Sequence, residues 1–208
     1  MAAELVAFLG VSAVVICTPG QDTALTVRNT LSGGRAGGVA TAAGVALGQA
    51  AWTVATAAGI ASLVAASRSA FVALQLIGAA YLVLLGLQTL GRALLGRRRT
   101  LHLVTASRAT PPEALRQGLL SNLANPKMAV FFTSLLPQFA PTGGLAFPTL
   151  LALGLLFSLL TFSWLCLYSL AVARASDVLI RDRIRRLLDA VTGAVLIALG
   201  VRVGLQRG

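Results

Sequence analysis

Long stretches without a charged residue are the feature that most constrains the fold of this chain. Residues 36–67 contain 32 consecutive uncharged residues and residues 69–91 contain 23, while between Arg116 and Arg174 the only charge is Lys127. Because a transmembrane helix needs about 20 apolar residues, these stretches predict one, one and two membrane spans. The chain is 57% hydrophobic and 11% charged, whereas soluble domains carry about 25% charged residues. A membrane protein is therefore predicted.

The spans are predicted to form two related halves. Shifting the sequence by 107 residues places Pro19 on Pro126 and residues 36–66 on residues 143–173. With one more span near each end of the chain, each half holds three spans. Since three is an odd number, the halves would run in opposite directions, as in the inverted repeats of many secondary transporters.

We therefore predict an all-α polytopic membrane protein with six transmembrane helices in two inverted three-helix repeats, in which proline breaks helices 1 and 4. Five spans are the alternative if the last segment lies only at the membrane interface. The predicted boundaries are residues 1–95 for the first repeat (spans 4–28, 36–66 and 69–92), 96–113 for a basic cytoplasmic linker, and 114–208 for the second repeat (spans 114–139, 145–172 and 187–205).

Arginine residues occupy alternate connections between the predicted spans. Arg28 and Arg35 follow span 1, six arginines lie between spans 3 and 4, and five lie between spans 5 and 6. The positive-inside rule places these three connections in the cytoplasm and both termini outside. The net charge of +11 is thus explained by topology and contact with lipid headgroups, and no nucleic-acid partner is expected.

Pro19 and Pro126 interrupt two of the spans, because proline removes a helical hydrogen bond and clashes with the preceding turn. Each follows a residue that favours the N-cap position, Thr18 and Asn125 respectively. Thr18 and Gln21 also have the spacing of a capping box. Both prolines are therefore interpreted as the starts of new half-helices inside the protein.

Two such helix starts, one in each half, predict a small polar chamber near the middle of the membrane. Helix N-termini present free N–H groups and a partial positive charge, so a carboxylate is a natural occupant. Lys127, the only lysine of the chain, is a candidate functional residue because charge is costly at that depth. The alternative is that Lys127 extends to the membrane surface. Asp22 is interpreted either as a functional acid, which holds a proton or a substrate ammonium or pairs with Lys127, or as the cytoplasmic end of span 1.

Span 2 adds a polar residue and a glycine motif. Gln49 either lines the chamber or bonds to a neighbouring helix. Gly44 and Gly48 form a GxxxG motif, which allows close helix packing within one subunit or at a dimer interface.

The residues just described resemble the lysine-exporter/homoserine-threonine-exporter (LysE/RhtB) family of bacterial amino-acid translocators. The matching stretches are CTPGQDTALTVRNTLSGGRAGGVATAAGVALGQAAW (17–52), LQLIGAAYLVLLGLQTL (74–90), LRQGLLSNLANPKMAVFFTSLLPQF (115–139) and TGAVLIALGVRV (192–203). The family often has Pro-Gly-Pro where this chain has Pro-Gly-Gln, and often an acid where this chain has Gln49. That second difference argues against a dibasic substrate and leaves Asp22 as the proton-coupling candidate.

The resemblance implies a multi-pass exporter in the bacterial inner membrane, driven by the proton motive force. We expect it to export a neutral amino acid of the threonine or homoserine type by proton antiport. The alternative is another small solute, such as an amino-acid derivative, a drug or a metal. The expected substrate- and ion-binding residues are Thr18, Pro19, Gly20, Gln21, Asp22, Gln49, Asn125, Pro126 and Lys127.

No enzymatic activity is expected, because the single histidine lies in a loop and no acid pair lies within a span. No cofactor or bound metal is expected either, since the chain has no Cys/His cluster. The expected partners are the solute, protons and the lipid bilayer, and a homo-oligomer is possible.

Overall fold

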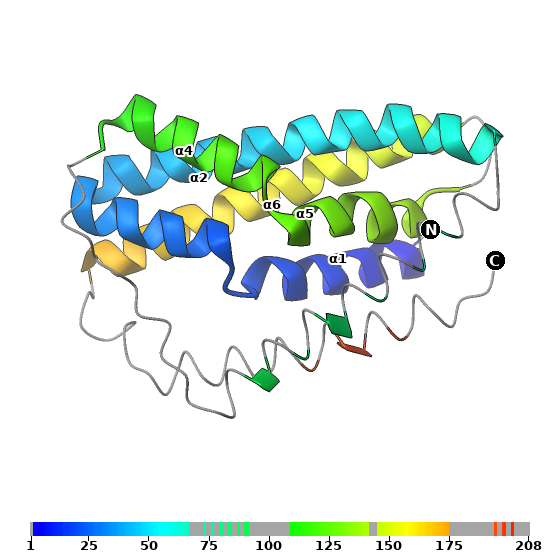
Figure 1. The fold of residues 1–208 in the computed structure, drawn as a ribbon, viewed down its shortest axis with the longest axis horizontal. Helices are drawn as coiled ribbons and strands as arrows, with labels where there is room; N and C mark the ends of the chain where they lie inside the picture. Colours follow the sequence, from blue (N-terminus) through cyan, green and yellow to red (C-terminus); the bar gives the residue numbers. More distant parts are fainter. Residues whose placement is uncertain are drawn as a thin grey trace.

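The computed structural model describes residues 2–66, 109–141 and 145–174, with isolated helical positions between residues 73 and 91 and between residues 194 and 201. Every element in these residues is helical (Figure 1). The elements are α1 (Ala2–Cys17), α2 (Gln21–Ala66), α4 (Pro111–Leu123), α5 (Pro126–Val130), the π-helix η1 (Phe131–Leu135), the 3₁₀ helix η2 (Leu136–Phe139) and α6 (Ala146–Arg174). The predicted spans 69–92 and 187–205, and most of the predicted linker, lie outside the described residues.

α2 consists of two helices that meet at Gly34. This residue has φ 66° and ψ −165°, a conformation that side chains with a Cβ rarely adopt. The short arm (residues 21–33) runs to this turn, and the long arm (residues 35–66) returns beside it (Figure 1). The turn therefore separates the first two predicted spans.

α4 begins at Pro111, three residues before the predicted start of its span at residue 114. The backbone N–H of Thr110 donates to Glu113 Oε2 at 2.8 Å, which is half of a capping box. The hydrogen bonds from Thr110 lower the pKa of Glu113. Pro111 and Pro112 fall within the predicted linker, but they form the first turn of α4. Proline is favoured in the first turn of a helix.

The described helices run in alternating directions. α1 and the short arm of α2 run one way, and α4 with α5 runs the other way (Figure 1). The long arm of α2 and α6 are also opposed. These directions are those that an inverted repeat requires, but the third helix of each half lies outside the described residues. The inverted repeat therefore stays a prediction.

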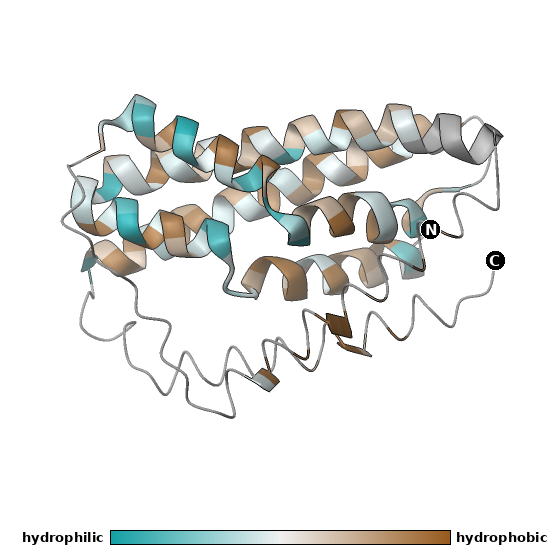
Figure 2. Cartoon of the chain, viewed as in Figure 1, coloured by the Kyte–Doolittle hydropathy of each residue, from teal (hydrophilic) through white to brown (hydrophobic). Residues whose placement is uncertain are grey.

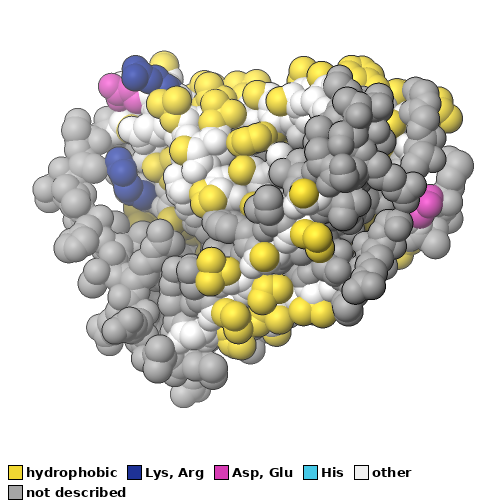
Figure 3. Space-filling view, turned by 45° about the vertical axis from the view of Figure 1, so that its right-hand side comes forward, with side chains coloured by type: hydrophobic (Ala, Val, Ile, Leu, Met, Phe, Trp, Pro, Cys, Tyr) yellow, Lys and Arg dark blue, Asp and Glu magenta, His cyan; other side chains and the backbone are white. Residues whose placement is uncertain are grey.

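By length and composition, two described stretches could cross a membrane, Gln21–Gly59 and Ala146–Arg174, and the apolar segment Glu4–Cys17 is shorter. Because Gln21–Gly59 turns back at Gly34, only its long arm can cross as one helix. Figure 2 shows apolar residues along α1 and the α5–η2 run, and hydrophilic residues concentrated in α4 and the short arm of α2. Exposed leucines on α6, among them Leu159 and Leu167 with 61% and 62% of their surface accessible, provide an apolar outer face. Figure 3 shows hydrophobic side chains spread over one flank of the molecule.

Aromatic side chains form the centre of the main core. Phe131 stacks on Phe157 with a centroid separation of 4.1 Å, and Phe132 packs edge-on against both rings. Phe8 from α1 and Ala57 from α2 are buried in the same cluster. The core therefore joins α1 and α2 to η1 and α6, and so links the two predicted halves.

Glycines bring α2 and α4 into close contact. A Cβ at Gly44 would clash with the backbone carbonyl of Leu115, and one at Gly48 would lie 2.9 Å from the side chain of Asn122. A Cβ at Gly118 would clash with the backbone of α2 in the same way. The interpretation of the GxxxG motif as packing within one subunit is confirmed.

Candidate functional site

Two helix breaks lie against each other in the interior of the bundle. The first break separates α1 from α2 at Thr18–Gly20, and the second separates α4 from α5 at Ala124–Asn125. Hydrogen bonds from side chains of each half connect the breaks, although the residues that they join lie about a hundred positions apart. The prediction of paired breaks at Pro19 and Pro126 is thus correct in position.

Asp22 belongs to the first turn of α2 and is buried, with 8% of its surface accessible. Its carboxylate accepts three hydrogen bonds from the second break. Ser121 Oγ donates to Oδ1 at 2.8 Å, and the Nδ2 atoms of Asn122 and Asn125 donate to Oδ2 at 2.8 and 2.9 Å. Hydrogen bonds to an ionised group are the stronger kind, so Asp22 ties the start of α2 to the end of α4.

Lys127, half-buried at the start of α5, makes the reverse connection. Its Nζ donates to the backbone carbonyls of Val15 at 3.1 Å and Thr18 at 3.2 Å. These carbonyls lie at the C-terminus of α1, the end of a helix that favours a positive charge. Lys127 therefore ties the start of α5 to the end of α1.

Pro19 explains why one of these carbonyls is available. In a continuous helix the N–H of residue 19 would donate to the carbonyl of Val15, but proline has no N–H. Lys127 Nζ supplies the missing donor from the other half. The same ammonium lies close to Gly20, since a Cβ at that position would be 3.3 Å from Nζ. A side chain there would crowd the lysine.

The predicted capping box at the first break is wrong. α2 begins at Gln21, not at Pro19, and Gly20 provides the first helical acceptor, for the N–H of Ala24. Thr18 Oγ1 instead donates to the carbonyl of Val14 at 2.6 Å, and so closes α1. Gln21 Nε2 donates to the backbone carbonyl of Ser121 at 3.3 Å. Both side chains find acceptors elsewhere, because Pro19 and Gly20 separate them from a common helix.

The predicted cap at the second break is confirmed. Asn125 is the N-cap of α5, Pro126 is its first residue, and Asn125 Oδ1 accepts from the backbone N–H of Lys127 at 3.0 Å. α5 is followed at once by the π-helix η1 and then by η2. The predicted span 114–139 is thus a short helix, a break and an irregular helical run.

Gln49 lies in the interior with 1% of its surface accessible. Its Nε2 contacts Met128 Sδ at 3.5 Å, beside Lys127, and its Oε1 has no hydrogen-bond partner among the described residues. Asn122 Oδ1 and Thr56 Oγ1 are buried without a partner in the same way. Buried polar atoms are costly when unpaired, at about 1–3 kcal/mol each, so each of these three atoms could accept a hydrogen bond from a bound solute that reached it.

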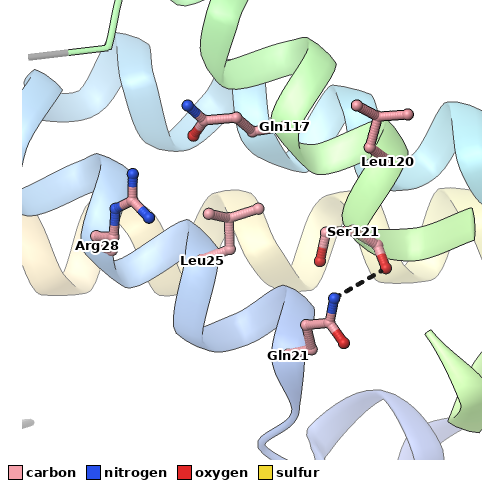
Figure 4. A pocket seen from close by; sticks show the side chains of 6 residues that line it. All are labelled: Gln21, Leu25, Arg28, Gln117, Leu120 and Ser121. Carbon is pink, nitrogen blue, oxygen red and sulfur yellow. Dashed lines mark hydrogen bonds between the residues drawn. The ribbon is translucent and has the colours of Figure 1, made fainter. Parts of the chain in front are cut away.

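A groove of about 500 Å³ lies between the short arm of α2 and α4 (Figure 4). Six residues line it: Gln21, Leu25, Arg28, Gln117, Leu120 and Ser121. The bond from Gln21 to Ser121 spans one side of the groove, and Ser121 Oγ reaches Asp22 beyond it. The groove is thus separated from the buried carboxylate by one hydrogen-bonded pair.

The short arm of α2 and α4, which form this groove, lie toward the end of the molecule at which basic residues gather (Figure 1). The turn at Gly34, the start of α4 and the end of α6 all lie at that end (Figure 1). Four arginines belong to these segments and so lie toward the same end: Arg28, Arg35, Arg116 and Arg174. This clustering agrees with the predicted alternation of basic connections.

Ser121 and Asn122 were missed by the sequence reasoning. They lie in the stretch LLSNLANPK, where two polar residues interrupt an apolar run five and four positions before Pro126. Their shared partner, Asp22, is 99 and 100 positions away, so no local pattern connects them. The available signal was their polarity within a predicted span.

The fold and the paired breaks fit a membrane transport protein: the described helices have an apolar outer face, and charged side chains meet polar ones inside at two interrupted helices. The chain belongs to the LysE type translocator family, whose model matches residues 13–207. It is therefore a membrane translocator of the exporter class, and this family consists of transporters rather than enzymes.

Three relatives illustrate the similarity. YrhP of Bacillus subtilis (strain 168) is 27% identical over 98% of this chain and 99% of its own length. A Vibrio cholerae protein is 35% identical over 72% of this chain and 71% of its own length. PA4757 of Pseudomonas aeruginosa is 33% identical over 91% of this chain and 89% of its own length. Each is named an uncharacterized membrane protein. No solved structure matches the chain.

Proposed function

We propose that this translocator exports a small zwitterionic solute, a neutral amino acid of the threonine or homoserine type, across the bacterial inner membrane by proton antiport. The observation that carries the proposal is the placement of Asp22 and Lys127 in opposing breaks, where Asp22 bonds to Asn125, two residues before Lys127, and Lys127 bonds to Thr18, four residues before Asp22. A zwitterion needs one anionic and one cationic partner. This pair supplies both at the junction of the two halves.

Each charged group has capacity left for a solute. An ammonium has three donors, and Lys127 uses two of them on the carbonyls of Val15 and Thr18. A carboxylate has about four acceptor sites, and Asp22 uses three. In the proposed bound state the solute carboxylate takes the third donor of Lys127. The solute ammonium then takes the remaining acceptor site of Asp22.

Proton coupling is assigned to Asp22. Protonation removes its negative charge and turns one acceptor site into a donor. The hydrogen bonds from Ser121, Asn122 and Asn125 would then be weakened together, since bonds to a charged group are stronger than bonds to a neutral one. The end of α4 would be released from the start of α2, and the halves could move to expose the chamber to the other side.

The solute class follows from charge and size. Gln49 is neutral and lies beside Met128 in the break region, so the described interior offers no second carboxylate for a dibasic solute. A drug exporter would need a larger site than one formed by short polar side chains. The binding and coupling residues proposed here are Thr18, Pro19, Gly20, Gln21, Asp22, Gln49, Asn125, Pro126 and Lys127.

The proposed orientation has the basic end in the cytoplasm, and both termini outside. The gathering of Arg28, Arg35 and Arg174 at one end supports it, because arginine is enriched in cytoplasmic connections. A topology reporter inserted within residues 96–112 is expected to report from the cytoplasm. An extracellular signal would contradict this orientation.

The direct experiment compares amino-acid export with and without the protein. Cells that express the wild-type chain or the Lys127→Met variant are loaded with a panel of amino acids, supplied as dipeptides, and the medium is sampled over time. Faster release of threonine or homoserine by the wild type, abolished by a protonophore, is expected. Equal release of every amino acid from wild-type and empty-vector cells would refute the proposal.

A further inference from the structure

The groove between the short arm of α2 and α4 is lined by an arginine whose Nε has no hydrogen-bond partner among the described residues. Arg28 lines the groove, and its Nε is fully buried without a partner in the described residues. Burying a donor of a charged group without an acceptor is costly. The guanidinium also forms no ion pair with the described residues, so its charge is available to an anion in the groove.

Gln117 lines the same groove from the opposite helix (Figure 4). Gln117 Oε1 is already occupied, because it accepts a hydrogen bond from Asn29 Nδ2 at 3.0 Å. This bond orients the side-chain amide and leaves its N–H₂ group to donate. Arg28 and Gln117 extend from opposite walls of the groove (Figure 4). A carboxylate suits this pair, because a guanidinium binds it through two parallel hydrogen bonds.

The remaining lining residues fit the rest of a small amino acid. Leu25 and Leu120 provide apolar walls, and the groove of about 500 Å³ is at the small end for ligand sites. Gln21 and Ser121 close the side nearest to Asp22 through the Nε2-to-carbonyl bond of 3.3 Å. Because Gln21 is exposed and this bond is long, it is the contact that can open most easily.

We infer that this groove is a separate docking site for the solute on the basic side of the protein, where Arg28 and Gln117 bind the carboxylate. The inference rests on the proposed function. Separation of Gln21 from Ser121 then passes the solute to Asp22 and Lys127. Ser121 takes part in both states, since its carbonyl holds Gln21 while its hydroxyl holds Asp22. Arg28 is thus a binding residue of the entry side, whereas Asp22 and Lys127 act at the junction.

The test measures solute uptake into everted membrane vesicles, which present the basic side to the medium. Initial rates are recorded over a concentration series of radiolabelled L-threonine or L-homoserine. Arg28→Gln is expected to raise KM about tenfold or more, since losing a charged hydrogen bond costs about 1.5–3 kcal/mol, with kcat changed less than twofold. Arg28→Lys keeps the charge and is expected to recover part of the affinity. Arg35→Gln is the control, because Arg35 is exposed and lies outside the groove. Its KM and kcat should match those of the wild type.

The outcomes separate this inference from the proposed function. Threonine or homoserine transport with the same KM in Arg28→Gln and Arg35→Gln would overturn the docking site and leave the proposed function standing. A loss of kcat in Arg28→Gln at unchanged KM, with normal monodisperse protein, would also overturn it, because that pattern indicates a structural role. If correctly folded wild-type protein transported neither threonine nor homoserine, the docking site and the proposed function would both be refuted.

Discussion

Asp22 and Asn125 are joined by a hydrogen bond of 2.9 Å between Nδ2 of the asparagine and Oδ2 of the aspartate, across 103 positions of sequence. Asn125 is also the N-cap of α5. One side chain thus starts a helix in the second half with its oxygen and holds the first half with its nitrogen. Any rearrangement that moves the halves apart must break this contact.

The connections between the halves are reciprocal. Lys127 of the second half holds the carbonyls of Val15 and Thr18. Asp22 of the first half holds the side chains of Asn122 and Asn125, which are the residues that the 107-residue offset places on Val15 and Thr18. In each half the same two positions before the proline are bound by a charged residue of the other half. This correspondence supports the predicted inverted repeat.

Replacing Lys127 with Met should abolish export while the protein still inserts and folds. Methionine fits the space of the lysine stem but cannot donate to Val15 and Thr18 or bind a carboxylate. Export is measured as release of the solute identified by the amino-acid panel, and insertion by the amount of monodisperse protein in detergent. Normal export by this variant would contradict the assignment of Lys127 to the site.

Replacing Pro19 with Ala should lower export roughly tenfold, because an N–H at position 19 competes with Lys127 for the Val15 carbonyl, and a charged hydrogen bond contributes about 1.5–3 kcal/mol. The free energy of unfolding should be unchanged or higher, since α1 gains a hydrogen bond. Pro112→Ala is the control, because Pro112 lies exposed in the first turn of α4, where an N–H has no helical acceptor. The idea fails if both variants export alike.

The sequence predicted the parts of this site that follow from local chemistry. Proline within an apolar span marks a break, and asparagine before proline marks a helix start, so Asn125, Pro126 and the position of the first break were predictable. Lys127 and Asp22 stood out because charge is costly within a span. These features need no knowledge of what lies opposite.

The remaining features depend on contacts between distant segments. Thr18 and Gln21 match the local pattern of a capping box, but Thr18 bonds back to Val14 in its own helix, and Gln21 bonds to Ser121 of α4, a contact between distant segments. The three donors to Asp22 come from the second half, and their pairing depends on how closely α2 and α4 approach. That approach depends on glycines such as Gly44. The sequence alone did not determine whether Gly44 packs within one subunit or at a dimer interface.

Replacing Asp22 with Asn should destabilise the protein as well as stop export. An asparagine can keep an oxygen for the hydrogen bonds from Asn122 and Asn125 by turning its N–H₂ group toward the hydroxyl of Ser121. The bonds to this neutral oxygen are weaker, since hydrogen bonds to an ionised acceptor are roughly twice as strong as neutral ones. The thermal midpoint in detergent should fall. The double variant Asp22→Asn, Asn122→Asp exchanges the two groups and should recover part of the loss. Equal midpoints for the wild type and the single variant would contradict this network.

Replacing Gly44 with Ala should lower the free energy of unfolding by about 1–3 kcal/mol, the usual cost of overpacking. The added methyl group would clash with the carbonyl of Leu115 and push α4 away from α2. Gly10→Ala is the matched control, because a Cβ there meets nothing within 4 Å and alanine is the better helix former. Denaturant or thermal unfolding in detergent measures both. A stable Gly44→Ala protein would indicate that the α2–α4 contact is looser than described.

Two replacements of Gln49 separate packing from transport. Leucine has a similar volume and no polar atoms, so Gln49→Leu should leave stability unchanged or raise it, since Oε1 has no partner among the described residues. Export of the neutral solute should nevertheless fall, because the interior loses a polar contact beside Met128. Gln49→Glu should instead allow release of a dibasic amino acid such as lysine, since a carboxylate can pair with the second ammonium. Export by each variant is measured with the same amino-acid panel. Unchanged export by both variants would contradict the assignment of Gln49 to the binding site.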